Sequence, residues 1–337
     1  MSADTSRETP PGRAGARAGR YRNPLERFLS HSFRLERGRH VDPAAVRGYP
    51  IDFSAKAAAP ALLPGFVDEP GRYLWVAHCQ RALGCYERWL AGEGEEWLAA
   101  AREAGDLLVR QQARGGPRDG GWVQLRPYPH TFVLRPPWVS AMAQGEGASL
   151  LVRLHAETGE ESYADAARRA LGPMSVPSSE GGACAPLDGR PFPEEYPTEP
   201  PSFVLNGAIF ALWGLRDVAV GLGDEGARQA FQDGVDALAA GIHRWDTGSW
   251  SLYDLFPHRV PNVASTAYHA LHVAQLEGMV ELAPRDELAA AAERFAAYGA
   301  SGRRRAVAFA RKALFRIAEP RSARAARLLP WASGRSG

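Results

Sequence analysis

The chain has 337 residues, of which 45% are hydrophobic and 23% are charged, so it can bury the core of one large or two smaller globular domains. Its formal net charge of +2 gives no support for a nucleic acid as its partner. The three cysteines, Cys79, Cys85 and Cys184, have neither zinc-ligand nor CxxC spacing and are expected to be free thiols in a reducing compartment.

Residues 1–20 are rich in Gly, Ala, Arg and Pro and are predicted to be a disordered basic segment. They contain no apolar stretch typical of a signal peptide. Residues 21–66, with little periodicity, are predicted to wrap irregularly around a main domain at 67–320, and 321–337 to form a C-terminal tail. No segment reaches the about 18 to 20 apolar residues that span a bilayer. We therefore expect a cytoplasmic protein without a membrane span.

From residue 73 onward, apolar residues recur at helical spacing in pairs of segments. The two members of a pair are joined by a short turn, and a Gly-rich segment follows each pair. The unit recurs about every 60 to 66 residues, which is typical of an array of helix pairs. The predicted helices are 73–90, 95–112, 139–158, 161–171, 202–222, 225–245, 264–282 and 284–298, followed by a turn at 299–302 and a basic helix.

The Gly-rich segments are long and carry aromatic residues, whereas the turns within the pairs are short. They are RDGGWVQL (118–125), EGGACAPLDG (180–189) and DTGSWSLYDL (246–255). Long loops gathered on one face favour a binding site there. We therefore predict an all-α protein, an incomplete (α/α) toroid with short hairpin-like loops on the active-site face. An irregular α-bundle is the alternative.

Basic residues also gather near the end of the predicted domain: Arg303, Arg304, Arg305, Arg311 and Lys312. Such a run is typical of a solubilising surface, and the alternative is a grip on a polyanion.

Several common cofactor and nucleophile motifs are absent or out of context. GLGDEG (221–226) matches G-x-G-x-x-G, but a helix precedes it where a dinucleotide site needs a strand, so a turn is predicted. His269 and His272 share a helical face, yet no third zinc ligand is near. Neither a P-loop nor a G-x-S-x-G elbow is present. We therefore expect no cofactor and no metal.

Acidic and phenolic residues remain as the candidates for chemistry. EEYPTEPPSFVLNG (194–207) is a loop whose prolines would hold Glu195 and Tyr196 rigidly, and Ser202 is a candidate N-cap of the next helix. Together with Tyr253 and Tyr268, they suit proton transfer at a carbon next to a carboxylate. The alternative is that Glu195 is a solvated loop acid and Tyr196 a packing residue.

Three sequence blocks carry a resemblance to a known family. They are PPWVSAMAQGEGASLLVR (136–153), EEYPTEPPSFVLNGAIFALWGLRD (194–217) and WDTGSWSLYDL with PNVASTAYHALHVAQL (245–275), and DGGW (119–122) adds a fourth. They resemble the C-terminal catalytic domain of the D-glucuronyl C5-epimerases of heparan sulfate and heparosan, in family order over about residues 62 to 300. The resemblance implies an incomplete α/α toroid that inverts C5 of glucuronate within a polymer, giving iduronate without nicotinamide.

The family also has an N-terminal β-rich domain, for which residues 1–60 show no pattern. Its catalytic glutamate and adjacent tyrosine match Glu195 and Tyr196, and its other two active-site tyrosines match Tyr253 and Tyr268. One departure concerns the carboxylate of the substrate. Where the family has an arginine that holds it, this chain has Phe256, and His258 or Arg259 is expected to substitute.

The resemblance suggests a mechanism in which Glu195 and Tyr268 act as acid and base on opposite faces of the sugar. A raised pKa of Glu195 would suit that role, and Tyr196 and Tyr253 would neutralise the substrate carboxylate. The remaining substrate-binding candidates are Trp122, Trp138 and Trp250 for stacking on sugar rings, and Gln144, Asn206 and His269 for orientation. For Trp138, core packing is an equal alternative.

Two other functions fit the same residues. A polysaccharide lyase begins with the same proton abstraction and then expels the 4-O substituent, and a non-catalytic glycan-binding protein would need only the tryptophans. In each case the expected partner is an acidic, glucuronate-containing polysaccharide. The polymer, its sulfation and the oligomeric state, a homodimer included, stay open.

Overall fold

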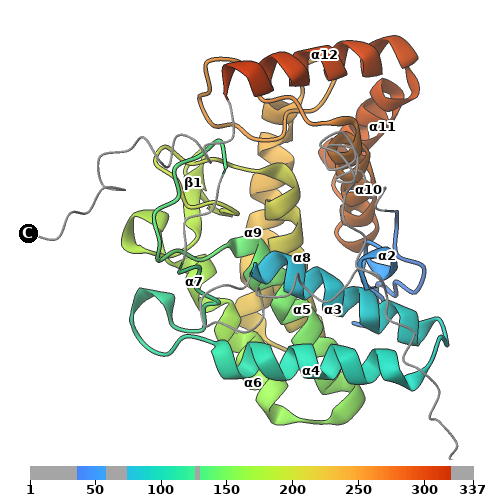
Figure 1. The fold of residues 1–337 in the computed structure, drawn as a ribbon, viewed down its shortest axis with the longest axis vertical. Helices are drawn as coiled ribbons and strands as arrows, with labels where there is room; N and C mark the ends of the chain where they lie inside the picture. The colour runs from blue at the N-terminus through green and yellow to red at the C-terminus, as the bar shows by residue number, and fades with distance from the viewer. Residues whose placement is uncertain (1–35, 58–73, 126–129, 320–337) are drawn as a thin grey trace, which may run out of the picture. The chain divides into compact units, whose positions relative to one another are not determined.

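The computed structural model describes residues 36–57, 74–125 and 130–319 (Figure 1). The predicted disordered segment at 1–20 and the predicted tail at 321–337 lie outside these residues, as does much of the predicted wrapping segment at 21–66. Within the described residues the chain is mainly helical and has one small β-hairpin.

The long helices form pairs along the chain, as the periodicity predicted. They are α3 (Trp75–Leu90), α4 (Glu95–Gln111), α5 (Ala141–Thr158), α6 (Glu161–Ala170), α8 (Leu205–Gly221), α9 (Glu225–Gly241), α10 (Thr266–Leu282), α11 (Asp286–Ala300) and α12 (Gly302–Ala318). The short elements are α2 (Ser54–Ala57), α7 (Gly172–Ser175), the 3-10 helices η1 (Gly116–Arg118), η2 (Ser178–Glu180) and η3 (Ile242–Trp245), and the strands β1 (Cys184–Leu187) and β2 (Arg190–Pro193).

The first member of each pair belongs to an inner layer. Helix α3 packs on α5, α5 on α8 and α8 on α10, while α4, α6, α9 and α11 each pack on the first helix of their own pair. The inner position explains the composition of α5 and α8, whose residues 141–154 and 205–219 are buried without interruption. The outer helices bury one face only. These layers are those of an incomplete α/α toroid, which confirms the predicted fold class.

Helices α5 and α8 approach each other closely at two glycines, Gly145 of α5 and Gly214 of α8. A Cβ placed on Gly214 would lie 2.3 Å from Cα of Gly145, and one on Gly145 would lie 2.5 Å from Cα of Ala211. Both obstacles are backbone atoms, which cannot rotate away. The sequence therefore needs glycine at this crossing for steric reasons.

We expect Gly214→Ala to lower the melting temperature. Alanine gains about 1 kcal/mol over glycine from helix propensity, but overpacking a tight core costs about 1–3 kcal/mol and here meets backbone. Thermal unfolding checks this, with Gly226→Ala in the exposed first turn of α9 as the control. A Cβ on Gly226 would meet only Oδ1 of Asp224, at 3.4 Å, so this change should stabilise. An unchanged or raised melting temperature for Gly214→Ala would contradict the steric explanation.

The described part of the segment before α3 is fixed at the C-terminal ends of the inner helices. The buried guanidinium of Arg153 donates to the carbonyls of Arg47 and Gly48, and its Nη1 lies 2.6 Å from Oδ2 of the equally buried Asp217. Arg216 donates to the carbonyl of Pro43. This segment covers the C-terminal ends of the inner helices. The long loops lie at the opposite, N-terminal ends.

Each Gly-rich segment leads towards the N-terminus of the next inner helix. Gln124 pairs with Trp138 just before α5, and Leu252 pairs with Val263 just before α10. Between them, β1 and β2 form a hairpin whose two turn residues, Asp188 and Gly189, both have positive φ, as a tight two-residue turn requires. The loops that the sequence predicted as site loops thus come together at one end of the inner layer.

Two further expectations concern GLGDEG and the membrane. Helix α8 ends at Gly221 and α9 begins at Glu225, with the Asp224 carboxylate accepting a hydrogen bond from the backbone of Ala227, so the motif is a turn between two helices, as predicted. Among the described residues, every helix is too short or too polar to cross a bilayer.

Candidate active site

Glu195 lies in the loop between β2 and α8, and its side chain is 4% exposed. The first turn of α8 leaves room for it, because a Cβ on Gly207 would lie 2.3 Å from Oε2 of Glu195. The Tyr196 hydroxyl donates a hydrogen bond to the carboxylate. Within the described structure, Oε2 has no hydrogen-bond partner. Glu195 is therefore a buried acid, and the alternative of a solvated loop residue does not hold.

The adjacent Glu194 holds this loop in place. Its carboxylate accepts hydrogen bonds from the backbone of Ser202 at 3.0 Å, from the Ser202 hydroxyl at 2.8 Å and from the backbone of Phe203 at 2.7 Å. The prediction that Ser202 caps the helix is therefore wrong. Its hydroxyl is bound by Glu194, Phe203 has a φ of +47°, and the helix begins only at Leu205.

The four predicted catalytic residues lie together. The rings of Tyr196, Tyr253 and Tyr268 form, with that of His130, a group that we call the aromatic cluster, and Glu195 is bonded to Tyr196. The His130 ring centroid lies 4.6 Å from that of Tyr196 and 6.4 Å from that of Tyr253. The rings of Tyr253 and Tyr268 meet edge to face at 4.9 Å. Trp138 lies 6.0 Å from Tyr196 and is 5% exposed, so it belongs to the wall of this cluster.

A polar network borders the aromatic cluster at Asp254. Its Oδ2 accepts a hydrogen bond from Nδ2 of Asn262 at 2.5 Å, and its Oδ1 lies 3.3 Å from Nε2 of His258. Lys312 of α12 donates to Oδ1 of Asn262 at 2.6 Å, and its Nζ lies 5.4 Å from the Tyr253 ring centroid. His258, expected to hold the substrate carboxylate, is thus engaged by Asp254, and the cation next to Tyr253 is Lys312.

Burial sets the protonation of the acids in this region. It raises the pKa of Glu195 to about 8, with Glu194 and Asp254 adding to the rise and the Tyr196 hydrogen bond opposing it. Burial likewise raises the pKa of Glu194 to about 7, against the hydrogen bonds from Ser202 and Phe203. Glu195 can therefore hold or release a proton near neutrality, as a reversible acid and base must.

The histidines behind the aromatic cluster have the opposite shift. Burial lowers the pKa of His269 to about 4 and that of His272 well below its usual value of 6.5, so both rings are neutral at pH 7. The Ser251 hydroxyl lies between them, 2.8 Å from Nδ1 of His269 and 2.9 Å from Nδ1 of His272. Nε2 of His269 lies 2.9 Å from the carbonyl of Phe295, to which it donates.

These shifts predict how stability depends on pH. Glu194 and Glu195 have raised pKa values, so their contribution is complete below the ordinary value of 4.5 and is lost as the pH rises through about 7 to 8. His269 has a lowered pKa, so its contribution is complete above 6.5 and is lost as the pH falls towards about 4. Between pH 6.5 and 8 the change in stability with pH therefore comes mainly from Glu194 and Glu195, because the contribution of His269 is already complete there.

We expect the free energy of unfolding to fall from pH 6.5 to 8, by a few kcal/mol at most, and Glu195→Gln to flatten this fall. Urea unfolding of both proteins at several pH values measures it. Parallel curves for the wild type and Glu195→Gln would mean that Glu195 is not held protonated in the folded protein.

Two predicted sugar contacts, Trp122 and Gln144, belong to the core instead. Trp122 has no exposed surface, and its indole donates to the carbonyl of Leu108 at 2.9 Å. Gln144 is equally buried, accepts from the backbone of Trp122 and donates to the carbonyls of Gly120 and Ala170. We correct both assignments, because a sugar cannot reach side chains enclosed in this way.

Trp250 and His269 also pack against other protein groups. Their rings stack at 3.7 Å with an angle of 17°, and the Trp250 indole donates to the carbonyl of Ala264. Since Trp250 is 2% exposed, its face is unavailable as a sugar platform, and His269 is enclosed by Ser251 and Phe295. These two residues support the loop that carries Tyr253.

Two further substrate-binding candidates differ in burial: Asn206 is buried and Arg259 is exposed. Asn206 is 2% exposed, precedes Gly207, and its Oδ1 has no hydrogen-bond partner within the described structure, so it stays a candidate. Arg259 is exposed, and no contact of its guanidinium with the aromatic cluster is present in the part of the chain that the structure describes. Lys312, in contrast, lies next to the Tyr253 ring.

Sequence reasoning did not select His130, Asp254, Asn262 or Lys312 as site residues. For Lys312 a signal was available. Ala308 and Phe315 are buried on one face of α12, and Lys312 is four residues after the first and three before the second, so it shares their face. A lysine on the buried face of a basic helix is unlike its solvated neighbours.

Comparison with known proteins gives the following similarities. A sequence model of the family described as "D-glucuronyl C5-epimerase C-terminus" matches residues 94–297. The chain is 36% identical over 222 residues to the D-glucuronyl C5-epimerase of Caenorhabditis elegans. The matched residues make up 60% of this chain and 35% of that protein. It is 29% identical over 144 residues to an uncharacterized protein of Methanocaldococcus jannaschii, covering 41% and 45%.

Among solved structures, the unsaturated glucuronyl hydrolase of Bacillus sp. GL1 is similar with a TM-score of 0.40 and 14% identity, covering 84% of this chain and 80% of that one. This chain spans about a third of the length of the C. elegans relative. Glu195 and the three tyrosines lie within the residues that the family model matches, and Lys312 lies beyond them.

Proposed function

The chain belongs to the D-glucuronyl C5-epimerase C-terminus family, and on this premise we propose that it inverts C5 of D-glucuronate residues within an acidic polysaccharide, giving L-iduronate. One observation supports this most: Glu195, with a pKa raised to about 8, is bonded to one of three tyrosines that meet in a single cluster. The proposed reaction uses no nicotinamide, because the proton leaves and returns without a hydride.

The chemistry explains why such a cluster is needed. The C5 hydrogen lies next to a carboxylate, and its removal places a second negative charge on that group. Donors that are already in place lower the barrier, because they need not reorganise as the charge develops. We assign this task to the hydroxyls of Tyr196 and Tyr253, which the rigid loop and α10 support. Glu195 then takes the proton from one face of the ring and Tyr268 delivers one to the other.

Lys312 supplies a positive charge where the family arginine is replaced by Phe256. The Phe256 ring packs on Phe132 at 5.2 Å and on His258 at 4.8 Å, so this position is apolar in this chain. The ammonium of Lys312 reaches the Tyr253 ring from α12 instead. We assign the substrate carboxylate to Lys312 and the two phenols, in place of His258 or Arg259.

We expect Lys312→Met to lower kcat/KM for C5 exchange about 10- to 100-fold, the effect of losing one charge-assisted contact in a partly dry site. Methionine keeps an apolar stem of similar length, and Lys312→Arg should restore part of the rate. Initial rates over a range of polymer concentrations measure both variants, with melting curves to check the fold. A wild-type kcat/KM for Lys312→Met would remove Lys312 from the mechanism.

Deuterium exchange tests the proposed function against its two rivals. The protein is incubated in D2O with glucuronate-containing polymers, unsulfated heparosan among them, and C5 is followed by NMR. Deuterium uptake with inversion and with unchanged chain length supports the epimerase. Cleavage with a new double bond would assign a lyase, and binding without exchange on any polymer would assign a glycan-binding protein.

A further inference from the structure

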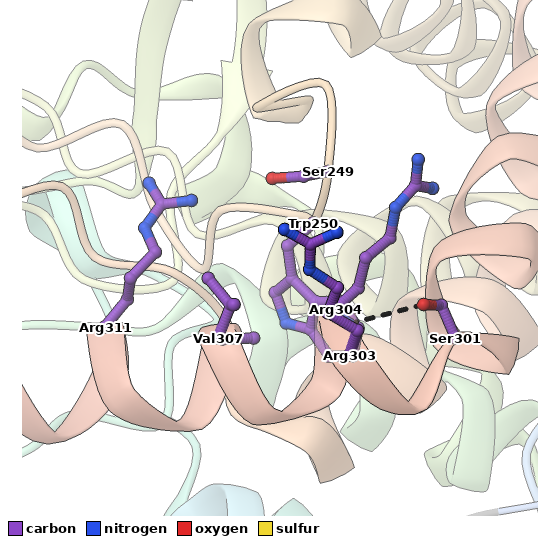
Figure 2. A pocket seen from close by; sticks show the side chains of 8 residues that line it. Ser249, Trp250, Ser301, Arg303, Arg304, Val307 and Arg311 are labelled. Atoms are coloured by element: carbon purple, nitrogen blue, oxygen red, sulfur yellow. Dashed lines mark hydrogen bonds between the residues drawn. The ribbon is translucent and has the colours of Figure 1, made fainter.

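A cavity of about 330 Å³ lies between the 249–250 turn and helix α12, outside the aromatic cluster. Figure 2 shows three arginine side chains rising from the side of α12 on which Ser249 and Trp250 lie. The residues that matter here are Ser249, Trp250, Ser301, Arg303, Arg304 and Arg311. We call this space the arginine cavity.

The arginine cavity concentrates positive charge that the described residues do not neutralise. The described residues provide no ion pair for Arg303, Arg304 or Arg311, although most other arginines of the described helices have one. The guanidinium of Arg304 lies over the Tyr298 ring at 4.6 Å, which holds it in place without cancelling its charge. Three cations around one hollow repel one another, and an anion in that hollow relieves the repulsion.

The arginine cavity adjoins the proposed active site through two short stretches of chain. Trp250, in its wall, is three residues before Tyr253, and Arg311 is followed directly by Lys312. The buried Trp250–His269 stack and the Ser251 hydroxyl between the two histidines make this connection rigid. A chain of sugars that is bound at Tyr253 and Lys312 and runs along α12 would meet the three arginines.

We propose that the arginine cavity is a subsite for a second anionic group, a carboxylate or a sulfate, on the same acidic polysaccharide as the reacting uronate. The proposal rests on the proposed function and adds a binding site to it. The three arginines of the cavity lie on helix α12, beyond residues 94–297 that the family model matches, whereas Ser249 and Trp250 lie within them.

Other polyanions fit the arginine cavity less well. Trp250 is 2% exposed and cannot stack on a base, which is the main attraction of single-stranded nucleic acids to such grooves. The formal net charge of only +2 also gives no general support for a duplex or a membrane as the partner. A hollow of this size suits one sugar with its charged group.

The test compares two double variants that remove the same charge. Arg303→Gln/Arg311→Gln removes from the cavity two cations that form no ion pair with the described residues. Arg110→Gln/Arg305→Gln removes two exposed arginines elsewhere, one on α4 and one on α12 outside the cavity. We expect the first pair to raise the KM for heparosan and its Kd about tenfold with kcat unchanged, and the control pair to stay within about twofold.

Each outcome separates the subsite from the proposed function. Equal Kd and KM for the two double variants would overturn the subsite, even if exchange at C5 proceeds. Loss of binding in the cavity variant only, with no exchange in any protein, keeps the subsite and overturns the epimerase. Tighter binding of the wild type to single-stranded DNA or to anionic phospholipid vesicles than to heparosan would assign the cavity to another partner and overturn the proposal.

Discussion

Glu195→Gln is expected to suppress C5 exchange about 1,000- to 10,000-fold, the upper part of the range for a positioned base, while the protein stays folded. The amide has the shape of the protonated acid, which burial favours in the folded protein, so the pocket against Gly207 still accepts it. It cannot accept the C5 proton, and removing a positioned base costs about 100- to 10,000-fold. NMR of C5 in D2O measures the rate.

The matched control is Glu199→Gln, the same change at an exposed position of the same loop. It should keep the wild-type rate. Exchange by Glu195→Gln within about tenfold of wild type would show that Glu195 is not the base. Glu194 would not replace Glu195 as the base, because the Glu194 carboxylate is already bound by Ser202 and Phe203. Replacing Glu194 should loosen the loop.

Tyr268→Phe is expected to have the second-largest effect, a loss of about 100- to 10,000-fold in inversion. Only the hydroxyl is removed. The ring that meets Tyr253 edge to face at 4.9 Å is kept, and Ser265 still caps α10 through the backbone of Tyr268, so the fold should not change. Inversion is measured as the appearance of iduronate by NMR.

Tyr298→Phe serves as the control for Tyr268→Phe. Its hydroxyl lies 3.4 Å from Oδ2 of Asp246, outside the aromatic cluster, and its removal should leave the rate unchanged. A Tyr268→Phe variant with near-normal inversion would assign the second proton transfer to another group, and the Tyr253 hydroxyl would be the first to examine.

The helices could be predicted from the sequence because their apolar periodicity is set by the same burial that forms them. The segment predicted at 73–90 is α3 (Trp75–Leu90), and that predicted at 161–171 is α6. The ends were less predictable where tertiary contacts decide them. Ser202 has the residue type of an N-cap, but its hydroxyl is hydrogen-bonded to Glu194 instead. The helix predicted at 225–245 ends as α9 at Gly241, and the 3-10 helix η3 follows it.

The proximity of Glu195 to the tyrosines followed from sequence blocks that a family shares in order. The tryptophans could not be sorted in the same way. An indole in a Gly-rich loop has the same pattern whether it faces a sugar or, like Trp122, the carbonyl of Leu108. His130 and Lys312 reach the site from distant parts of the chain, so only the folded arrangement brings them to Tyr253.

The most direct measurement is the isotope found at C5 of each epimer at the earliest times of reaction in D2O. If Glu195 and Tyr268 act on opposite faces, newly formed iduronate carries deuterium from the solvent, while unreacted glucuronate keeps its protium. Protium retained in the iduronate would mean that one group moves the same proton across the ring, and this would contradict the two-sided mechanism.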